Sequence, residues 1–186
     1  ELSDFWEESI RTVFETGEDV PAQFEWESAQ GTVHLDWRLS PEFDERGRVR
    51  SVLGISRDIT ERKRAEETLR RSESQLRAVF ENAAAGMALC DREGRFLQVN
   101  QRFCRIMART EKDLLGRTFR DLTHPEEHEA DAEAVRALYD GEVDSFTREK
   151  RYLAGDGRTV RGSVSVGLLR DAEGVPELTV AVLLDV

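Results

Sequence analysis

Two histidines set four residues apart are side chains that could do chemistry. His124 and His128 lie at the expected start of a helix, and an imidazole can ligate haem iron or zinc. They stand beside Pro125 and among three glutamates, which suit the positive end of a helix dipole. The pattern favours a solvated first helical turn, with haem ligation or a zinc pair as alternatives, and no metal site is predicted.

Cysteine chemistry is limited to Cys90 and Cys104, which are 14 residues apart. Two such residues indicate neither a disulfide framework nor a metal cluster, and we interpret Cys104 as a small core residue. The sequence contains no glycine-rich phosphate loop, no Ser/His/Asp set at a supporting spacing and no kinase or cyclase signature. It therefore predicts no catalytic site, and any enzymatic output domain is expected outside this chain.

The 186-residue chain carries 27 Lys and Arg against 38 Asp and Glu, a net charge of −11. An acidic chain without a basic stripe argues against nucleic acid and against anionic membrane surfaces as partners. No apolar run approaches the roughly 20 residues of a membrane span, and no signal peptide opens the chain. We expect a reduced, cytoplasmic protein. Its start at Glu1 and its end within an expected strand suggest a piece of a longer one.

A long helix must connect whatever lies on either side of it. Residues 61–82 contain neither Gly nor Pro, and small or apolar side chains recur there at heptad spacing. This apolar seam consists of Ala65, Leu69, Ser72, Leu76 and Val79. So narrow a stripe predicts a homodimeric coiled coil, and the alternative is an amphipathic helix lying on its own domain.

The two ends of the chain repeat a pattern of one helix followed by three antiparallel strands. Thr32 falls on Thr159 and Asp58 falls on Asp185 at one common offset of 127 residues. The first copy is expected as a helix over 4–17 and strands over 23–27, 33–39 and 49–57. The second copy begins with a hairpin of 87–91 with 95–99, which the first copy lacks. Helices capped by Asn100, Thr110 and Thr123 follow. Its last three strands are expected over 144–152, 158–168 and 177–185. We predict a partial domain over 1–60, a linker over 61–82 and a domain over 83–186.

Motifs at three places in the chain resemble the PAS sensory domains of bacterial signalling proteins. They are residues 94–100 (Gly-Arg-Phe-Leu-Gln-Val-Asn), 121–126 (Asp-Leu-Thr-His-Pro-Glu) and 58–63 (Asp-Ile-Thr-Glu-Arg-Lys). The last is similar to the family's usual exit from its final strand into a signalling helix. The resemblance implies an α+β fold with a five-stranded antiparallel sheet and helices on one face, preceded here by the C-terminal half of a first copy. The last strand of that half, Val49–Arg57, is expected to have a bare edge. Residues 1–57 are therefore expected to be held by a second chain or to be poorly ordered.

The resemblance also implies where ligands and signals would act. Ligands would bind between helices and sheet, near Phe103, Met107, Leu114, Leu115, Phe119, Leu122, Leu138, Val164 and Val182. We favour the alternative that these residues simply fill a core, since no polar group is clearly aimed inward. Relay residues would be Asp58, Ile59, Thr60 and Asp185. Haem-binding relatives take an axial histidine from the long helix. Photoreceptor relatives form a flavin adduct on a cysteine of a later helix, whereas Cys104 is expected in the first helix. No cofactor is therefore favoured.

The function implied is a sensory module of a histidine kinase or cyclic-dinucleotide enzyme. It would relay a ligand or dimer-geometry change through the linker helix to an output domain in the same polypeptide. The alternatives are a haem- or flavin-binding redox or gas sensor, which a visible absorption band would reveal, and a structural dimerisation spacer. Expected partners are a second copy and a small-molecule ligand, without nucleic acid or membrane insertion.

Overall fold

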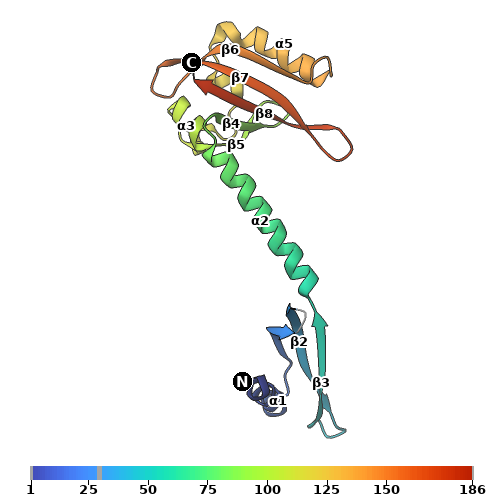
Figure 1. Cartoon of the computed structure of the whole chain (residues 1–186). Coiled ribbons are helices and arrows are strands. Elements are labelled where there is room, and N and C mark those ends of the chain that lie inside the picture. The colour runs from blue at the N-terminus through green and yellow to red at the C-terminus, as the bar shows by residue number, and fades with distance from the viewer. Residues whose placement is uncertain (1, 29–30, 186) are drawn as a thin grey trace. The chain divides into compact units, whose positions relative to one another are not determined.

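The computed structural model describes residues 2–28 and 31–185 (Figure 1). The chain divides into two compact units, Glu1–Glu73 and Ser74–Val186. Helix α2 (Thr60–Asn82) begins in the first unit and ends in the second. Of the helices in the described ranges, none is both long enough and apolar enough to cross a membrane.

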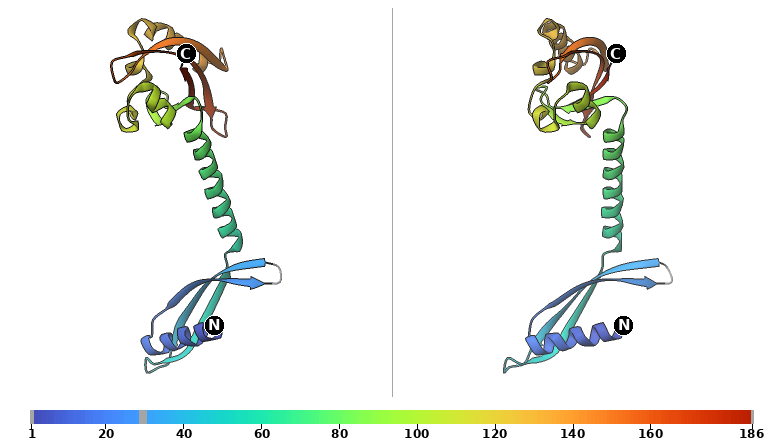
Figure 2. Two further views of the ribbon diagram at one scale, coloured as in Figure 1. Left: turned by 60° about the vertical axis from the view of Figure 1, so that its left-hand side comes forward. Right: turned by 90° about the vertical axis from the view of Figure 1, so that its left-hand side faces the viewer.

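The first unit is a three-stranded antiparallel sheet with one helix packed on it (Figure 2). Trp37 and Leu39 of the middle strand and Val13 of the helix form its buried core. The helix ends where Gly17, at φ 69°, donates its N–H to the carbonyl of Val13 at 2.9 Å. Its elements are α1 (Leu2–Thr16), β1 (Val20–Ser28), β2 (Gly31–Phe43) and β3 (Val49–Asp58).

Strand β3 lies at the edge of this sheet and pairs, within the described residues, with β2 alone. Leu53 and Ile55 are 48% and 56% exposed on it. The bare edge expected for Val49–Arg57 is therefore present in the described part of the chain. Pairing of that edge with a second chain stays a prediction.

The second unit is a five-stranded antiparallel sheet in the order β5-β4-β8-β7-β6, with helices on it. This confirms the α+β fold class that the sequence predicted. The strands are β4 (Gly86–Cys90), β5 (Phe96–Val99), β6 (Ser145–Leu153), β7 (Thr159–Arg170) and β8 (Pro176–Asp185). The helical elements are α3 (Gln101–Met107), α4 (Glu111–Leu114), η1 (Phe119–Leu122), η2 (Pro125–Glu127) and α5 (His128–Tyr139).

The internal repeat extends to the pairing of individual residues. Asp58 lies opposite Leu35 in the first unit, and Asp185 lies opposite Gly162 in the second. Each residue of the first pair is therefore 127 positions before its counterpart in the second pair, which is the offset that relates the two copies in the sequence. Strands β2 and β3 of the first unit thus share one register with β7 and β8 of the second.

One expected helix start is wrong. We expected Thr123 to cap a single helix running to Tyr139, but its hydroxyl donates to the carbonyl of Phe119 at 2.9 Å. The 3-10 turn η2 starts only after His124 and leads into α5. The reason is tertiary, because the N–H of His124 donates to Arg151 of β6 at 2.9 Å and Thr123 bridges to Tyr152. These contacts hold residues 123 and 124 extended beside the sheet.

Candidate functional site

A cavity of about 60 Å³ lies inside the second unit, between the sheet and its helices. Aromatic and aliphatic side chains make up most of its wall, which is the usual composition of a small-molecule site. Charged residues also line it, namely Lys150 and Asp131 together with Asp91 and Arg92. The apolar part of the wall includes Phe96, Phe103, Phe119, Leu122, Val164 and Val166.

Lys150 is buried against this cavity, at 8% exposed. Its Nζ donates to a carboxylate oxygen of Asp131 and to Oγ1 of Thr123, the latter at 3.1 Å. The same Nζ lies 4.9 Å from the ring centroid of Tyr152 and 5.5 Å from that of Phe119. An ammonium facing two ring faces gains cation–π stabilisation, which partly replaces its lost hydration.

Asp131 is held by a second cation and belongs to a network at the edge of the sheet. Its Oδ1 lies 3.2 Å from the guanidinium of Arg148, and its side chain is 4% exposed. Arg148 also reaches Glu127 at 3.4 Å, and Glu127 in turn accepts from Arg151 at 3.1 Å. These pairs connect α5 and η2 to strand β6.

Burial shifts the pKa values of groups around the cavity. Desolvation lowers the pKa of the Lys150 amine, although the Asp131 carboxylate acts to raise it. Desolvation also raises the pKa of the Tyr152 hydroxyl and raises the pKa of the Cys90 thiol to about 12. Cys90 is therefore a protonated thiol near neutral pH. A buried ion pair at a cavity wall marks a candidate functional site.

The hydroxyl of Tyr139 is a further polar group at this cavity. Its oxygen is buried, and no hydrogen-bond partner for it exists among the described residues. The guanidinium of Arg92 lies 5.6 Å from the centroid of the same ring. Burying an unpaired hydroxyl costs free energy, so a ligand that could bond to it would be favoured.

The structure distributes the expected pocket residues over several places. Phe103, Phe119, Leu122 and Val164 line the cavity. Three other members of the set are fully buried in the core, namely Met107, Leu114 and Leu138. Leu115 is 41% exposed on the surface, and Val182 is half-buried on β8.

The expectation that no polar group is aimed inward is wrong, because Lys150 and Asp131 are. Strand β6 alternates between its faces, so Lys150 shares the inner face with Tyr152 and lies between the more exposed Glu149 and Arg151. That alternation is the signal that could have found Lys150. No local pattern singles out Asp131, which faces inward from the first turn of α5.

The two histidines have local hydrogen-bond partners. Nε2 of His128 lies 3.0 Å from the carbonyl oxygen of Thr123, and the N–H of Glu126 donates to Nδ1 of His124 at 3.4 Å. In residues 2–28 and 31–185, no group of three His, Cys, Asp or Glu side chains is placed to hold a metal ion. Cys104 lies on α3, half-buried against the core.

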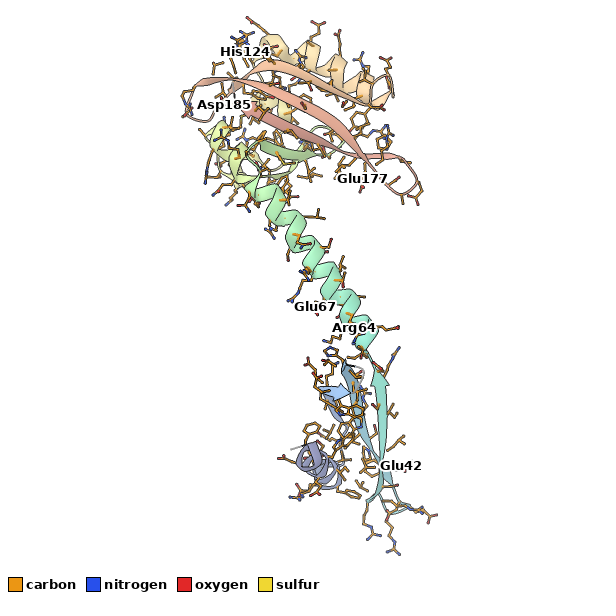
Figure 3. All side chains as sticks on the ribbon, in the orientation of Figure 1. Glu42, Arg64, Glu67, His124, Glu177 and Asp185 are labelled. Carbon is orange, nitrogen blue, oxygen red and sulfur yellow. The ribbon has the colours of Figure 1, made fainter. Side chains whose placement is uncertain are left out.

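The expected relay residues surround the start of α2. The N–H of Thr60 donates to Oδ1 of Asp58 at 2.8 Å, and the hydroxyl of Thr60 accepts from the N–H of His34 at 2.8 Å. Ile59, 5% exposed, donates its N–H to the carbonyl of His34 at 2.9 Å. The hydrogen bonds from Thr60 lower the pKa of Asp58. Asp185, labelled in Figure 3, instead borders an open hollow with Arg102, Arg105, Arg158 and Arg161.

At the other end of α2, Asn100 connects the helix to neighbouring elements by hydrogen bonds. The sequence predicted only that Asn100 caps the next helix. Its side chain is 0% exposed. Its amide oxygen accepts from the N–H of Met87 at 2.9 Å and of Phe103 at 2.8 Å. Its amide nitrogen donates to the carbonyls of Phe80 at 2.9 Å and Ala85 at 3.0 Å. One side chain therefore connects α2, β4 and α3.

The apolar seam of α2 is exposed. Leu69, Leu76 and Val79 are 61%, 68% and 70% exposed, and Ala65 and Ser72 are exposed as well. Side chains of α2 such as Arg64 and Glu67 extend away from the helix axis (Figure 3). Helix propensity alone gives an isolated helix little stability in water. Packing of this apolar stripe against another element or another chain is needed to stabilise the helix.

The chain is similar to parts of larger signalling proteins. It is 36% identical over 115 residues to a probable diguanylate cyclase of Escherichia coli, DgcE, covering 62% of this chain and 10% of that protein. It is 33% identical over 115 residues to the sensor histidine kinase TmoS of Ectopseudomonas mendocina, covering 62% of this chain and 12% of that protein. The chain thus spans only about a tenth of these relatives.

Solved structures agree with the fold, and a family profile agrees with the repeat. The PAS domain of an HTR-like protein from Haloarcula marismortui superposes with a TM-score of 0.55 at 29% identity, covering 67% of this chain and 99% of that one. A PAS domain of a two-component sensor histidine kinase gives a TM-score of 0.52 at 21% identity, covering 62% and 99%. The family described as "PAS fold" matches residues 6–64 and 80–186. The chain therefore belongs to the PAS fold family.

Proposed function

We propose that this chain is the non-catalytic sensory part of a signalling protein and that α2 relays changes between its copies of the fold. The observation that carries the proposal is the position of Asn100. It caps α3, whose Phe103 lines the cavity, and it donates to Phe80 in the last turn of α2. A ligand that moves Phe103 would change the hydrogen bonds of Asn100 and hence the end of the helix.

The start of α2 supports the same proposal. Thr60 is 7% exposed and bonds to both Asp58 and His34, so strand β2 fixes where the helix begins. The output would lie outside this chain, in an enzyme of the histidine kinase or diguanylate cyclase type. The cytoplasmic location expected from the sequence stays a prediction.

We expect Asp58→Ala to change signalling more than it changes stability. The substitution removes an exposed carboxylate that accepts from the Thr60 N–H, which loosens the start of α2 without leaving a cavity in the core. The measurement is kinase activity of a fusion in which this chain precedes a histidine kinase core, together with the melting temperature. Asp44→Ala is the matched control, because Asp44 accepts from Arg46 and Arg48 in a turn on the same sheet. Equal kinase activity in both variants would argue against the relay role.

The seam supports a homodimer through α2. Each glutamate placed in a buried seam costs about 1–3 kcal/mol or more, so Leu69→Glu with Leu76→Glu should convert dimer to monomer at micromolar concentration. Ser74→Glu with Ala78→Glu is the control, because it adds the same charge on the exposed side of the helix away from the seam. Light scattering distinguishes the two variants. A full dimer in the Leu69/Leu76 variant would exclude the seam as the interface.

A further inference from the structure

Four arginines from two distant parts of the chain border one open hollow on the second unit. They are Arg102 and Arg105 of α3 and Arg158 and Arg161 at the start of β7. This arginine hollow has a volume of about 390 Å³, and small-molecule sites in proteins have volumes of about 300–1,000 Å³. It shares no described lining residue with the cavity between the sheet and its helices. The arginine hollow is therefore a separate place at which a ligand could bind.

Two of these arginines have partners within the protein. Nε of Arg158 lies 2.7 Å from Oδ2 of Asp156, two residues earlier in the chain. Arg105 donates to the amide oxygen of Gln101 at 2.8 Å, and a neutral amide does not balance its charge. Over residues 2–28 and 31–185, Arg158 is thus the one arginine of the hollow that forms an ion pair.

The other two arginines of the hollow, Arg102 and Arg161, are unpaired. In the part of the chain that the structure describes, neither guanidinium has a hydrogen-bond or ion-pair partner. Asp185 also borders the hollow, but within the same residues its carboxylate forms no ion pair with any of the four arginines. The donors of Arg102 and Arg161 are therefore free to contact a ligand.

The surroundings of the hollow keep an excess of positive charge. Its nearby carboxylates are Asp156 and Asp185, and Glu81 accepts from the N–H of Gln101 at the start of α3 at 3.2 Å. Even with all three counted, the four arginines outnumber them. This excess occurs in a chain whose net charge is −11, so it is a local concentration of arginine.

The positions of these arginines are locally unfavourable. Arg102 lies in the first turn of α3, where the helix dipole disfavours a positive charge. Arg105 follows three residues later on the same side of the helix, so the two like charges repel each other. Arg161 lies opposite Arg151 of β6, another cation, whose guanidinium already contacts two glutamates. Proteins break such local rules mainly at functional sites, which indicates a function for the cluster.

The internal repeat shows that the strands do not need two of these arginines. At the offset of 127 residues, Arg158 and Arg161 fall on Gly31 and His34 of the first unit. Strands β2 and β3 nevertheless pair in the same register as β7 and β8. The arginines of β7 are thus a feature of the second unit and not a requirement of the fold.

The donors of the hollow fit a phosphoryl group better than a carboxylate. Each guanidinium is a planar fork of N–H donors that matches pairs of phosphate oxygens. A carboxylate offers two oxygens and one charge, whereas a phosphate monoester offers three free oxygens and a charge of about −2 at neutral pH. A phosphoryl group can therefore contact several arginines at once. Asp185 can accept a hydrogen bond from a hydroxyl group elsewhere on such a ligand.

We propose that the arginine hollow binds a small organic phosphate. The phosphoryl group contacts Arg102, Arg105 and Arg161, and a hydroxyl group of the ligand donates to Asp185. The concave shape favours a small molecule over an acidic protein segment as the occupant. This site goes beyond the proposed sensory function, because it lies outside the cavity and neither proposal depends on the other.

The test uses ribose 5-phosphate as the probe, because it combines one phosphoryl group with several hydroxyl groups. Ribose is the neutral control, and gluconate supplies a carboxylate on a similar hydroxylated body. Each compound is titrated into the 15N-labelled full chain at constant ionic strength, and the backbone amide shifts are recorded. We expect saturable shifts in α3 and at the start of β7 with ribose 5-phosphate, weaker binding of gluconate and no shifts with ribose.

Variants then test the contacts directly. Arg102→Gln with Arg161→Gln removes the two unpaired guanidinium groups and should weaken binding of ribose 5-phosphate about 10-fold or more, as expected for lost charged hydrogen bonds. Arg70→Gln with Arg71→Gln is the control, because it removes the same charge from exposed positions of α2 outside the hollow.

Several outcomes would overturn the proposal. They are equal weakening in the two double variants, amide shifts confined to other parts of the chain, and gluconate binding as tight as that of ribose 5-phosphate. Tighter binding of a hexaglutamate peptide to the same arginines would also overturn it, because the hollow would then fit an acidic protein partner.

Discussion

Asn100→Ala should lower the free energy of unfolding of the second unit by about 3–5 kcal/mol, the sum of a lost helix cap and several buried groups left without partners. The side chain is 0% exposed and satisfies two N–H donors and two carbonyl acceptors. Water cannot replace these bonds without entering the core. Urea denaturation of the full chain, followed by a probe in the second unit, measures the loss.

Two further variants separate the roles of this residue. Asn100→Asp keeps the oxygen that accepts from Met87 and Phe103 but places a carboxylate against two carbonyls, so it should specifically loosen the end of α2. Hydrogen exchange at the end of the helix would report this. Asn82→Ala is the control, since Asn82 is exposed and bonds only locally to Ala78. Similar losses for Asn100→Ala and Asn82→Ala would contradict the buried network.

Asp131→Ala should destabilise the second unit by about 3–5 kcal/mol, because it leaves the buried Lys150 without its carboxylate. The double variant Asp131→Leu with Lys150→Met should recover most of this loss, since a buried ion pair can often be replaced by apolar side chains of similar volume. The measurement is again the free energy of unfolding of the full chain. Glu133→Ala, an exposed acidic position on the same helix, should have little effect.

A different pattern would contradict the assigned contact. If Asp131→Ala were as mild as Glu133→Ala, Lys150 would not depend on Asp131. If the double variant were less stable than Asp131→Ala, the amine would have another essential anion.

Much of the fold could be predicted because it follows from local periodicity. The heptad spacing between Ala65 and Val79 predicted the long helix, and the alternation of Val33 to Leu39 predicted a strand with one buried face. Strands β2 and β3 pair in the same register as β7 and β8 at the offset that relates Asp58 to Asp185, because no insertion separates the two strands of either pair.

The site was harder to predict because its contacts are tertiary. Lys150 and Asp131 are 19 residues apart, and Asn100 and Phe80 are 20 apart, on different elements. Charged residues are most often solvated, so composition alone gave no reason to place Lys150 and Asp131 inside. The start of α5 was misjudged for the same reason, since β6 and not the local sequence holds His124 extended.

The sheet topology also sets the order in which the chain can fold. In the first unit, each strand pairs with its neighbour in the sequence, so its ladders close over short loops. In the second, β4 pairs with β8, and Gly86 lies opposite Leu183, 97 residues later. Contacts this distant slow folding, and β4 has no partner on that side until β8 has been synthesised. During translation the β4 edge of the second unit therefore stays unpaired until β8 emerges. A chaperone that shields such edges would have to protect it for longer than any edge of the first unit.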